Sequence, residues 1–295
     1  MTVSHSETEY SAAAMVESIL AGELGPSAAP DERAWHRAWS ARDLSARSPV
    51  EMALAGGALA DRLPWVFVSG YQAALRAVFP SLPPSGWAAF VATEDQADPL
   101  AHPGVLITDA GEGWELNGYK AWVAQSRHVS HLIVTARQRP DDVTPRSVLI
   151  AADASGVELS HRDSPGFLAD MTQGFAKFQA VRGRDEPFDF ERSRAFGRSE
   201  GRFVMLAASA FLLAQQAQAA SVEDANVALT SGLANLCEAQ AVTPRALAAF
   251  DRLFSRCVAS FDARGEDTVP AWRTDRRLLS MYSQRIQRRA ARAAP

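Results

Sequence analysis

Cysteine is scarce in this 295-residue sequence, and no apolar segment is long enough to cross a bilayer. Cys237 and Cys257 are the only cysteines, which is too few for a disulfide framework or a thiolate metal site. We interpret them as small core residues in a reducing compartment. The longest apolar run, residues 203–214, contains a serine, whereas a membrane-spanning helix needs about 20 apolar residues. We therefore expect no membrane association.

Lysine is also rare, because only Lys120 and Lys177 are lysines among the 30 basic residues. With the abundant alanine, this preference for arginine indicates a biased genomic composition. The net charge of −4 gives no general attraction to nucleic acid, so we do not expect nucleic acid as a partner. The first 20 residues contain three glutamates and no basic segment ahead of an apolar core, so we expect no signal peptide. These features predict a cytoplasmic protein.

Three zones of different residue pattern follow one another. Residues 1–85 are rich in alanine, with apolar residues at helical spacing, and predict an N-terminal helical domain. Residues 86–188 contain short β-prone runs separated by turn residues, which favours a middle domain built as an antiparallel barrel or sandwich. Helical spacing returns over residues 189–295 and predicts a C-terminal helical domain.

Two of the expected helices have marked starts. Ser48-Pro49 followed by Glu51 is typical of an N-cap with proline in the first turn. Thr243-Pro244 is a second signal of this kind, ahead of a helix expected over residues 244–261. Three further C-terminal helices are expected, one along the apolar face of residues 203–217 and two over residues 222–240 and 272–291.

The segment Trp-Glu-Leu-Asn-Gly-Tyr-Lys-Ala-Trp-Val, residues 114–123, is the most informative part of the middle zone. Asn-Gly between two β-prone runs is the strongest short signal for a hairpin, because a type I′ turn needs positive φ at both central residues. The sequence therefore predicts a hairpin turn at Asn117-Gly118.

This segment, together with Phe-Val-Ala-Thr-Glu at residues 90–94, resembles the middle domain of the acyl-CoA dehydrogenases. The order of helical, strand and helical zones is also that of this family. The resemblance implies an α+β fold with an N-terminal helical domain, a middle antiparallel β-barrel and a C-terminal four-helix bundle. It also implies a bound FAD, whose isoalloxazine ring the two segments frame.

The resemblance assigns the residues at the flavin. Residues 90–94 lie where the family presents backbone amides and a threonine hydroxyl to the flavin edge, where donors can tune the ring. Trp122 corresponds to a tryptophan packed against the ring, which can shield it from water. The expected cofactor-binding residues are Phe90, Ala92, Thr93, Trp122, Val123 and Ala124.

Several positions depart from the family pattern. After Thr93-Glu94 the family continues with a glycine- and serine-containing loop, whereas residues 95–100 here read Asp-Gln-Ala-Asp-Pro-Leu. Proline has no N–H and the two aspartates repel anions, so this loop is poorly suited to phosphate. Ala124 replaces a family threonine, and the Gly-Gly-x-Gly segment that helps to hold the adenine end is absent.

The usual catalytic base is missing as well. In the family a glutamate follows the tyrosine that corresponds to Tyr282, in Glu-Gly-Thr, but here Tyr282 is followed directly by Ser283-Gln284. Some members carry the base on the first helix of the C-terminal domain, and Glu200 is the acid nearest that place. A plainer interpretation of Glu200 is a carboxylate that stabilises a helix N-terminus.

Two other groups of residues have less specific patterns. His128 and His131 are three residues apart but lack a matched carboxylate, so we expect solvated or capping histidines and no metal site. The C-terminal 23 residues include seven arginines and one acid, Asp275. Such a stripe is able to bind a CoA or FAD phosphate, or nucleic acid, but a solvated final helix is the default.

Two functions follow. The first is an FAD-dependent oxidoreductase that acts on the Cα–Cβ bond of an acyl-CoA or acyl-carrier thioester, with Glu200 as the candidate base. The alternative is an acyl-CoA dehydrogenase-like partner or binding protein that has lost catalysis with its glutamate. By analogy with the family, we expect a homo-oligomer or a partner subunit.

Overall fold

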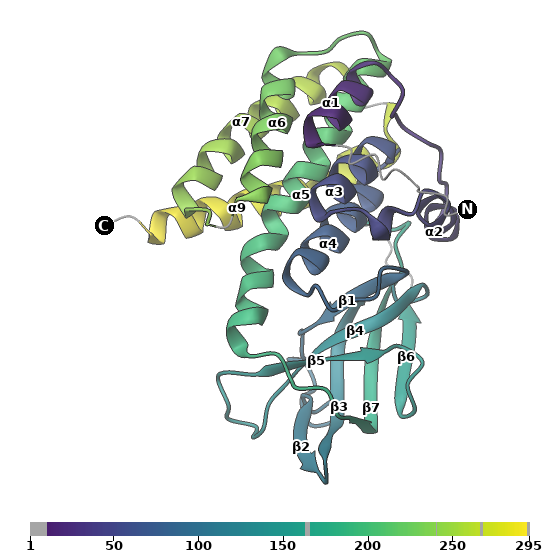
Figure 1. Cartoon of the computed structure of the whole chain (residues 1–295), viewed down its shortest axis with the longest axis vertical. Coiled ribbons are helices and arrows are strands. Elements are labelled where there is room, and N and C mark those ends of the chain that lie inside the picture. Colours follow the sequence, from purple (N-terminus) through teal and green to yellow (C-terminus); the bar gives the residue numbers. More distant parts are fainter. Residues whose placement is uncertain (1–10, 163–165, 240, 266–267, 294–295) are drawn as a thin grey trace, which may run out of the picture.

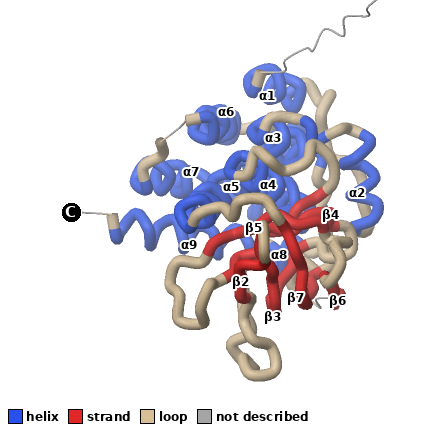
Figure 2. The backbone as a smooth tube through the Cα atoms, turned by 60° about the horizontal axis from the view of Figure 1, so that its bottom comes forward, coloured by secondary structure: helices blue, strands red, loops and turns tan. Residues whose placement is uncertain are grey.

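Helices and strands occupy opposite halves of the molecule (Figure 1). The computed structural model describes residues 11–162, 166–239, 241–265 and 268–293. The first ten residues of the predicted N-terminal domain, Gln240 at the end of a predicted helix, and the last two residues lie outside this part. Figure 2 shows from a second direction that the strands remain grouped beneath the helices. The predicted order of helices, strands and helices is confirmed.

The N-terminal helices are α1 (Ala12–Leu20), α2 (Glu32–Ala41), the 3-10 turn η1 (Leu44–Ala46), α3 (Pro49–Leu59) and α4 (Leu63–Val78). Helix α3 begins where the sequence predicts. The Ser48 hydroxyl accepts a hydrogen bond from the Glu51 N–H at 3.3 Å, and the Ser48 N–H donates to the Glu51 carboxylate at 3.0 Å. This reciprocal capping satisfies two amides that a helix start leaves without a partner.

The C-terminal helices are α5 (Phe190–Gln218), α6 (Asp224–Glu238), α7 (Pro244–Gly265), the short α8 (Trp272–Asp275) and α9 (Arg277–Arg292). Thr243 caps α7 as predicted, because its hydroxyl accepts the Ala246 N–H at 3.2 Å. The four longer helices pack against one another in the manner of a bundle. No helix in the described residues has both the length and the apolar character that a membrane span requires.

The strands form two open sheets, so the structure does not show the predicted barrel. One sheet has the order β1 (Trp87–Val91), β4 (Val129–Ala136), β5 (Arg146–Ala151), and its β1–β4 pair is parallel. The other has the order β2 (Leu106–Ala110), β3 (Gly113–Ala124), β7 (Gln173–Gly183), β6 (Val157–Arg162). Apolar side chains from both sheets share one core, which contains Val91, Leu132, Leu116 and Phe178. Burial of these inner faces against each other replaces closure by hydrogen bonds.

The prediction of a hairpin turn at Asn117-Gly118 is wrong. Strand β3 runs through both residues without a turn, and the turn that reverses the chain lies at Gly111-Glu112, between β2 and β3. Gly118 has φ +133° and lies at an irregularity of the pairing with β7. A Cβ atom on Gly118 would lie 2.6 Å from the Gly104 carbonyl oxygen, so glycine is needed for a close approach of two backbones and not for a turn.

Helices from both ends of the chain share a second core. Helices α3 and α4 pack along α5, and their buried side chains join those of α6, α7 and α9 in one apolar cluster. The approach of α3 to α5 is very close, because a Cβ atom on Gly57 would lie 2.1 Å from the Ala207 carbonyl oxygen. The N-terminal helices are therefore held in a fixed position on the bundle.

Candidate functional site

A cavity of about 300 Å³ lies where the helices meet the sheets. Its walls come from α4, β3, α5, α9 and the loop between β6 and β7, which are far apart in the sequence. Most of the lining is apolar, and the residues that supply it include Phe67, Trp122, Phe167, Leu168, Met171 and Leu278. A mostly apolar cavity with a few polar groups is the usual form of a small-molecule site.

Glu200 supplies a carboxylate to this cavity. Its side chain is 14% exposed and accepts a hydrogen bond from the Arg285 guanidinium at 3.1 Å. Burial raises the pKa of Glu200, while Arg285 and a hydrogen bond with Tyr282 act in the opposite direction. Glu200 lies well inside α5 (Phe190–Gln218), beyond its first turn, so stabilisation of the helix N-terminus does not explain it. A buried carboxylate beside an apolar cavity is a candidate general base.

Trp122 lies on β3 and forms another wall of the same cavity. Its indole N–H donates to the Gln173 side-chain oxygen at 3.0 Å, and its ring meets the rings of Phe67 and Tyr71 edge-on. The Tyr71 hydroxyl accepts the Phe90 N–H at 2.6 Å, so this predicted flavin donor already has a partner. The structure thus brings Trp122 and Glu200 to one cavity.

The other residues predicted at the flavin lie away from this cavity. Ala92 and Thr93 are exposed beyond the end of β1. Val123 and Ala124 are fully buried, Val123 in the core between the sheets and Ala124 in the helical core. None of the four lines the cavity, and their role as cofactor contacts remains a prediction.

The two segments that carry the family resemblance are joined by a buried ion pair. Lys120 is 1% exposed and donates to the Glu94 carboxylate at 3.1 Å and to the Thr135 hydroxyl at 3.0 Å. Arg137 pairs with the other oxygen of Glu94 at 3.0 Å. Burial lowers the pKa of Lys120, and the Glu94 charge counteracts that effect. Glu94 and Lys120 therefore hold β1 to β3 and β4, a structural role that the motif alone did not reveal.

The loop of residues 95–101 binds its own backbone amides. The Asp95 carboxylate accepts the Ala97 N–H at 2.9 Å and the Asp98 N–H at 3.2 Å, and Asp98 accepts the Ala101 N–H at 3.0 Å. These hydrogen bonds lower the pKa of Asp95. A phosphate would need these donors free, so the loop is not built to hold one.

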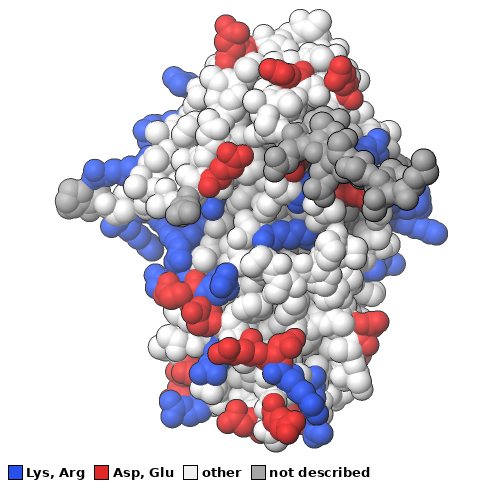
Figure 3. Space-filling view, viewed as in Figure 1, with Lys and Arg blue, Asp and Glu red and all other residues white. Residues whose placement is uncertain are grey.

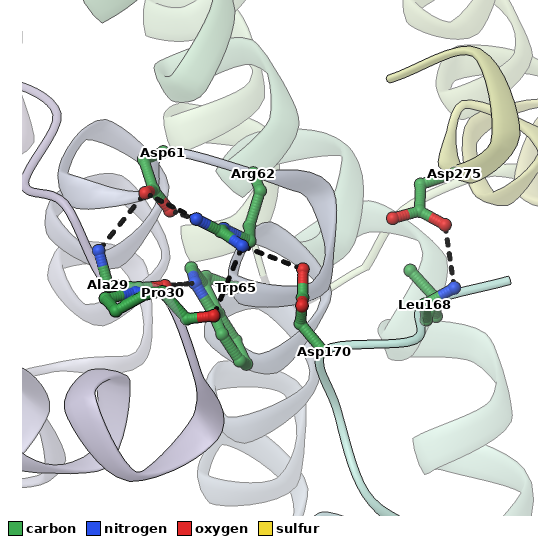
Figure 4. Close-up of polar contacts among 8 residues, drawn as sticks. All are labelled: Ala29, Pro30, Asp61, Arg62, Trp65, Leu168, Asp170 and Asp275. Atoms are coloured by element: carbon green, nitrogen blue, oxygen red, sulfur yellow. Dashed lines mark hydrogen bonds and ion pairs between the residues drawn. The ribbon is translucent and has the colours of Figure 1, made fainter. Parts of the chain in front are cut away.

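The loop of residues 166–173 is instead held by acids and a base from the helices (Figure 4). The Asp275 carboxylate of α8 accepts the Leu168 N–H at 2.7 Å, and Arg62 pairs with Asp170 at 2.9 Å. Glu32 of α2 accepts the Thr172 hydroxyl at 3.0 Å and also its N–H. Since this loop forms one wall of the cavity, three helices fix the shape of the site.

Two of these anchoring groups, Glu32 and Asp275, are buried, whereas Arg62 and Asp170 are half-buried. Arg62 also pairs with Asp61 at 3.0 Å. Asp275 is 0% exposed, and one of its oxygens has no hydrogen-bond partner. Burial raises the pKa of Asp275 to about 6 and that of Glu32 to about 7. The sequence offered no signal for this cluster, because its contacts to the loop join residues more than 100 positions apart.

The described residues contain no group of three or more histidines, cysteines or acids placed to hold a metal ion. His128 stacks on His36 with ring centroids 5.0 Å apart, and burial lowers the pKa of both rings. His131 lies 3.0 Å from the Ser130 hydroxyl. The two histidines singled out in the sequence thus have separate surroundings.

Comparison with known proteins identifies relatives by structure alone. No protein-family model and no curated protein matches the sequence. A crystal structure of an FAD-dependent dehydrogenase superposes with a TM-score of 0.69 at 15% identity, over 95% of this chain and 96% of that one. The prolyl acyl carrier protein oxidase AnaB gives 0.62 at 13% identity, over 95% and 92%. Glutaryl-CoA dehydrogenase from Mycobacterium smegmatis with FADH2 gives 0.52 at 13% identity, over 94% and 88%.

These matches span nearly the whole of each chain. The protein therefore has the fold of the acyl-CoA dehydrogenase-like flavoproteins, which confirms the expected resemblance at the level of fold. At such low identity the structural similarity shows the shared fold, but not the reaction of any one member.

Proposed function

We propose that this protein is a flavin-dependent oxidoreductase that acts on the Cα–Cβ bond of an acyl thioester in the cavity between Trp122 and Glu200. One observation carries the proposal: an aromatic ring suited to cover a flat cofactor and a buried carboxylate line the same apolar cavity. The names of the structural neighbours, which include dehydrogenases and an acyl carrier protein oxidase, support the same class of reaction.

The cavity is suited to a flavin ring, whereas the loop of residues 95–101 is poorly suited to the phosphates of FAD. Trp122 would cover the ring, and the aromatic lining would exclude water from it. The volume of about 300 Å³ lies at the lower end of the range of about 300–1,000 Å³ for ligand sites. When bound, a flavin supplies the hydride acceptor. Contacts from Phe90, Ala92, Thr93, Val123 and Ala124 belong to the proposal, and Phe90 would have to release Tyr71 to make one.

Glu200 would remove the α proton of the acyl group. An apolar surrounding that raises the pKa of a carboxyl makes its anion a stronger base, and a base works best with a pKa near the working pH. Arg285 and Tyr282 restrain the carboxylate by hydrogen bonds, so its position in the cavity wall is fixed. Among the described residues, Glu200 supplies the only carboxylate in the wall of this cavity.

Purification under gentle conditions tests the cofactor directly. We expect flavin absorbance in the purified protein, or its recovery when FAD is added. Glu200→Gln should then lower turnover of acyl-CoA with an artificial electron acceptor by about 10²- to 10⁴-fold while leaving flavin bound. Glu191→Gln, an exposed acid on the same helix, is the matched control and should keep wild-type turnover. A protein that neither contains nor takes up flavin would refute the proposal.

The second candidate is a thioester-binding protein without oxidoreductase activity. The amide-capped loop of residues 95–101 and the missing glutamate after Tyr282 favour it. Under this alternative, acyl-CoA binds with equal affinity in the presence and absence of FAD, and no turnover appears with any acceptor. We also expect assembly as a homo-oligomer or with a partner subunit, which light scattering after size-exclusion chromatography would measure.

A further inference from the structure

The loop of residues 166–173 separates the cavity from solvent by a single thickness of chain. Leu168 and Met171 line the cavity and are 4% and 1% exposed. Ala169, which lies between them in the sequence, is exposed. The loop thus presents an apolar inner face to the cavity and an outer face to water.

The tip of this loop, residues 166–171, has a backbone that residues with side chains rarely adopt. Leu168 has φ +52°, in the left-handed region, and Gly166 two positions earlier has φ +93°. The Leu168 carbonyl accepts the Met171 N–H at 3.1 Å and closes a tight turn. A strained backbone of this kind persists only while its surroundings hold it in place.

Two polar contacts hold the tip to the helices (Figure 4). The Asp275 carboxylate accepts the Leu168 N–H at 2.7 Å, and Arg62 donates to Asp170 at 2.9 Å. Both contacts join side chains of the helical half to the loop, and neither belongs to a strand ladder. Loss of the two contacts would leave the tip held by the packing of its side chains.

A third contact at the tip is weak. Figure 3 shows basic side chains along the left edge of the molecule, where the C-terminal part of α9 lies. Arg277, at the other end of α9, lies over the Phe167 ring, with its guanidinium carbon 4.7 Å from the ring centroid. Arg277 is exposed, and a cation–π contact at an exposed site stabilises little.

The other end of the loop is anchored much more firmly, at Thr172. Its carbonyl accepts the Gln125 N–H at 2.8 Å, and its hydroxyl accepts the Arg127 N–H at 3.2 Å. Glu32 of α2 accepts the Thr172 hydroxyl at 3.0 Å as well as the Thr172 N–H. Thr172 is therefore a fixed point from which the tip extends.

The charges around the tip do not balance. Arg62 faces Asp61 and Asp170, and Asp275 lies beside them with one oxygen that has no hydrogen-bond partner. Burial and the charge of Asp170 raise the pKa of Asp275 to about 6, against the effects of the Leu168 N–H and Arg62. Movement of the tip away from the helices would separate Asp170 from Asp275 and relieve this repulsion.

We propose that residues 166–171 form a lid over the cavity, latched shut by Asp275 and Arg62 and able to swing outward from Thr172. Opening exposes Met171, releases the strained backbone at Leu168 and connects the cavity to solvent. The lid thus controls access to the cavity. The inference depends on the cavity and the loop, and not on a bound flavin or a catalytic base.

Thiol labelling of Met171→Cys with dithionitrobenzoate measures opening of the lid. The two native cysteines, Cys237 and Cys257, lie in the helical core and are 6% and 2% exposed. The introduced thiol should react about tenfold faster than Cys257 or more, because local opening precedes global unfolding. Ala169→Cys, on the outer face, is the control for thiol reactivity and should react faster still. Equal rates for the introduced thiol at position 171 and Cys257 would overturn the proposal.

The latch is tested in the same Met171→Cys background. Asp275→Ala removes the acceptor of the Leu168 N–H and should raise the labelling rate relative to Cys257 about tenfold. Asp275→Asn keeps an oxygen that can accept this N–H and should not raise it. The ratio to Cys257 cancels any change in global stability. An unchanged ratio in Asp275→Ala would contradict the role of Asp275 as a latch.

Deuterium exchange of the unmodified chain gives an answer even if Met171→Cys does not fold. The Leu168 amide should exchange about tenfold faster than the amide of Leu206, another buried leucine in the middle of α5, and equal protection would refute the lid. Neither measurement needs flavin or substrate. A colourless protein would therefore refute the proposed oxidoreductase and leave the lid standing, whereas a rigid loop would refute the lid alone.

Discussion

The loops of residues 95–101 and 166–173 both use carboxylates to bind backbone N–H groups, but the acids come from different places. In the first loop Asp95 and Asp98 belong to the loop itself and bind amides within a few residues. In the second, Glu32 and Asp275 reach in from helices more than 100 residues away. The same hydrogen-bond chemistry therefore closes one loop on itself and couples the other to the whole helical half.

The difference in burial reverses the sign of the pKa shifts. Asp95 is half-buried at the surface and gains hydrogen bonds from the Ala97 N–H, His102 and the Asp98 N–H that outweigh its desolvation, so its pKa falls. Asp275 and Glu32 lose hydration that their hydrogen bonds do not fully replace, so the pKa of each rises. Glu32 and Asp275 thus fix the cavity wall but lower the stability of the protein near neutral pH. Asp95, which binds amides of its own loop, has no such cost.

Arg62→Met should show the largest effect, because it removes the cation between Asp61 and Asp170. Arg62 and Asp61 are 13% and 17% exposed, so removal of this cation leaves two carboxylates uncompensated in a largely buried place and should cost about 3 kcal/mol. Urea denaturation would measure the fall in the free energy of unfolding. The exposed Arg184, paired with Glu112 at 3.6 Å, offers the control Arg184→Met, which should change little. Equal losses in the two variants would remove the distinction between the loops.

Asp275→Asn should change how stability depends on pH. The pKa of Asp275 is raised from 3.8 to about 6, so the folded state binds the proton more tightly than the unfolded state. The stability that the protonated Asp275 carboxyl contributes to the wild type is therefore present below pH 4 and is lost as the pH rises through about 6. The variant lacks this loss, so between pH 4 and pH 8 its stability should gain about 3 kcal/mol relative to wild type.

Glu32→Gln should show the same sign over a higher range, since the pKa of Glu32 rises from 4.5 to about 7. Denaturation midpoints of wild type and both variants at pH 4, 6 and 8 provide the comparison. A variant that is less stable than wild type at pH 8 would show that the lost hydrogen bond outweighs the desolvation of the charge.

Asp95→Ala should have the smallest effect. The loop of residues 95–101 lies outside the helical core, so the midpoint of unfolding should stay at the wild-type value. The Ala97 and Asp98 amides lose their acceptor and should exchange with deuterium faster, while the Leu168 amide keeps its rate. A drop in the midpoint would mean that this loop, too, supports the tertiary structure.

The sequence predicted the elements well where the signal was local. The Ser48 and Thr243 caps start helices, and the β-prone runs became strands. The prediction was wrong at Asn117-Gly118, where the same dipeptide that favours a turn instead permits close approach of Gly104. Local patterns also could not predict whether the sheets close into a barrel, because alternation of apolar residues fits a sandwich and a barrel equally well.

The sequence predicted less of the candidate site than of the fold. Trp122 was identified by its motif, and Glu200 by its place on the first helix after the strands. Nothing local indicated that both face one cavity, or that Glu200 is held by Arg285 from a helix 85 residues away.

By itself, the sequence determined the order of helices and strands and several helix starts, because caps and hydrophobic periods act over a few residues. Its resemblance to a known family indicated the fold family, but not the open sheets. Only the tertiary structure decided that Glu94 and Lys120 form a structural ion pair, that one loop seals its own amides, and that buried acids shape the cavity. Those outcomes depend on burial and on contacts between distant segments, which set the cost of each charge.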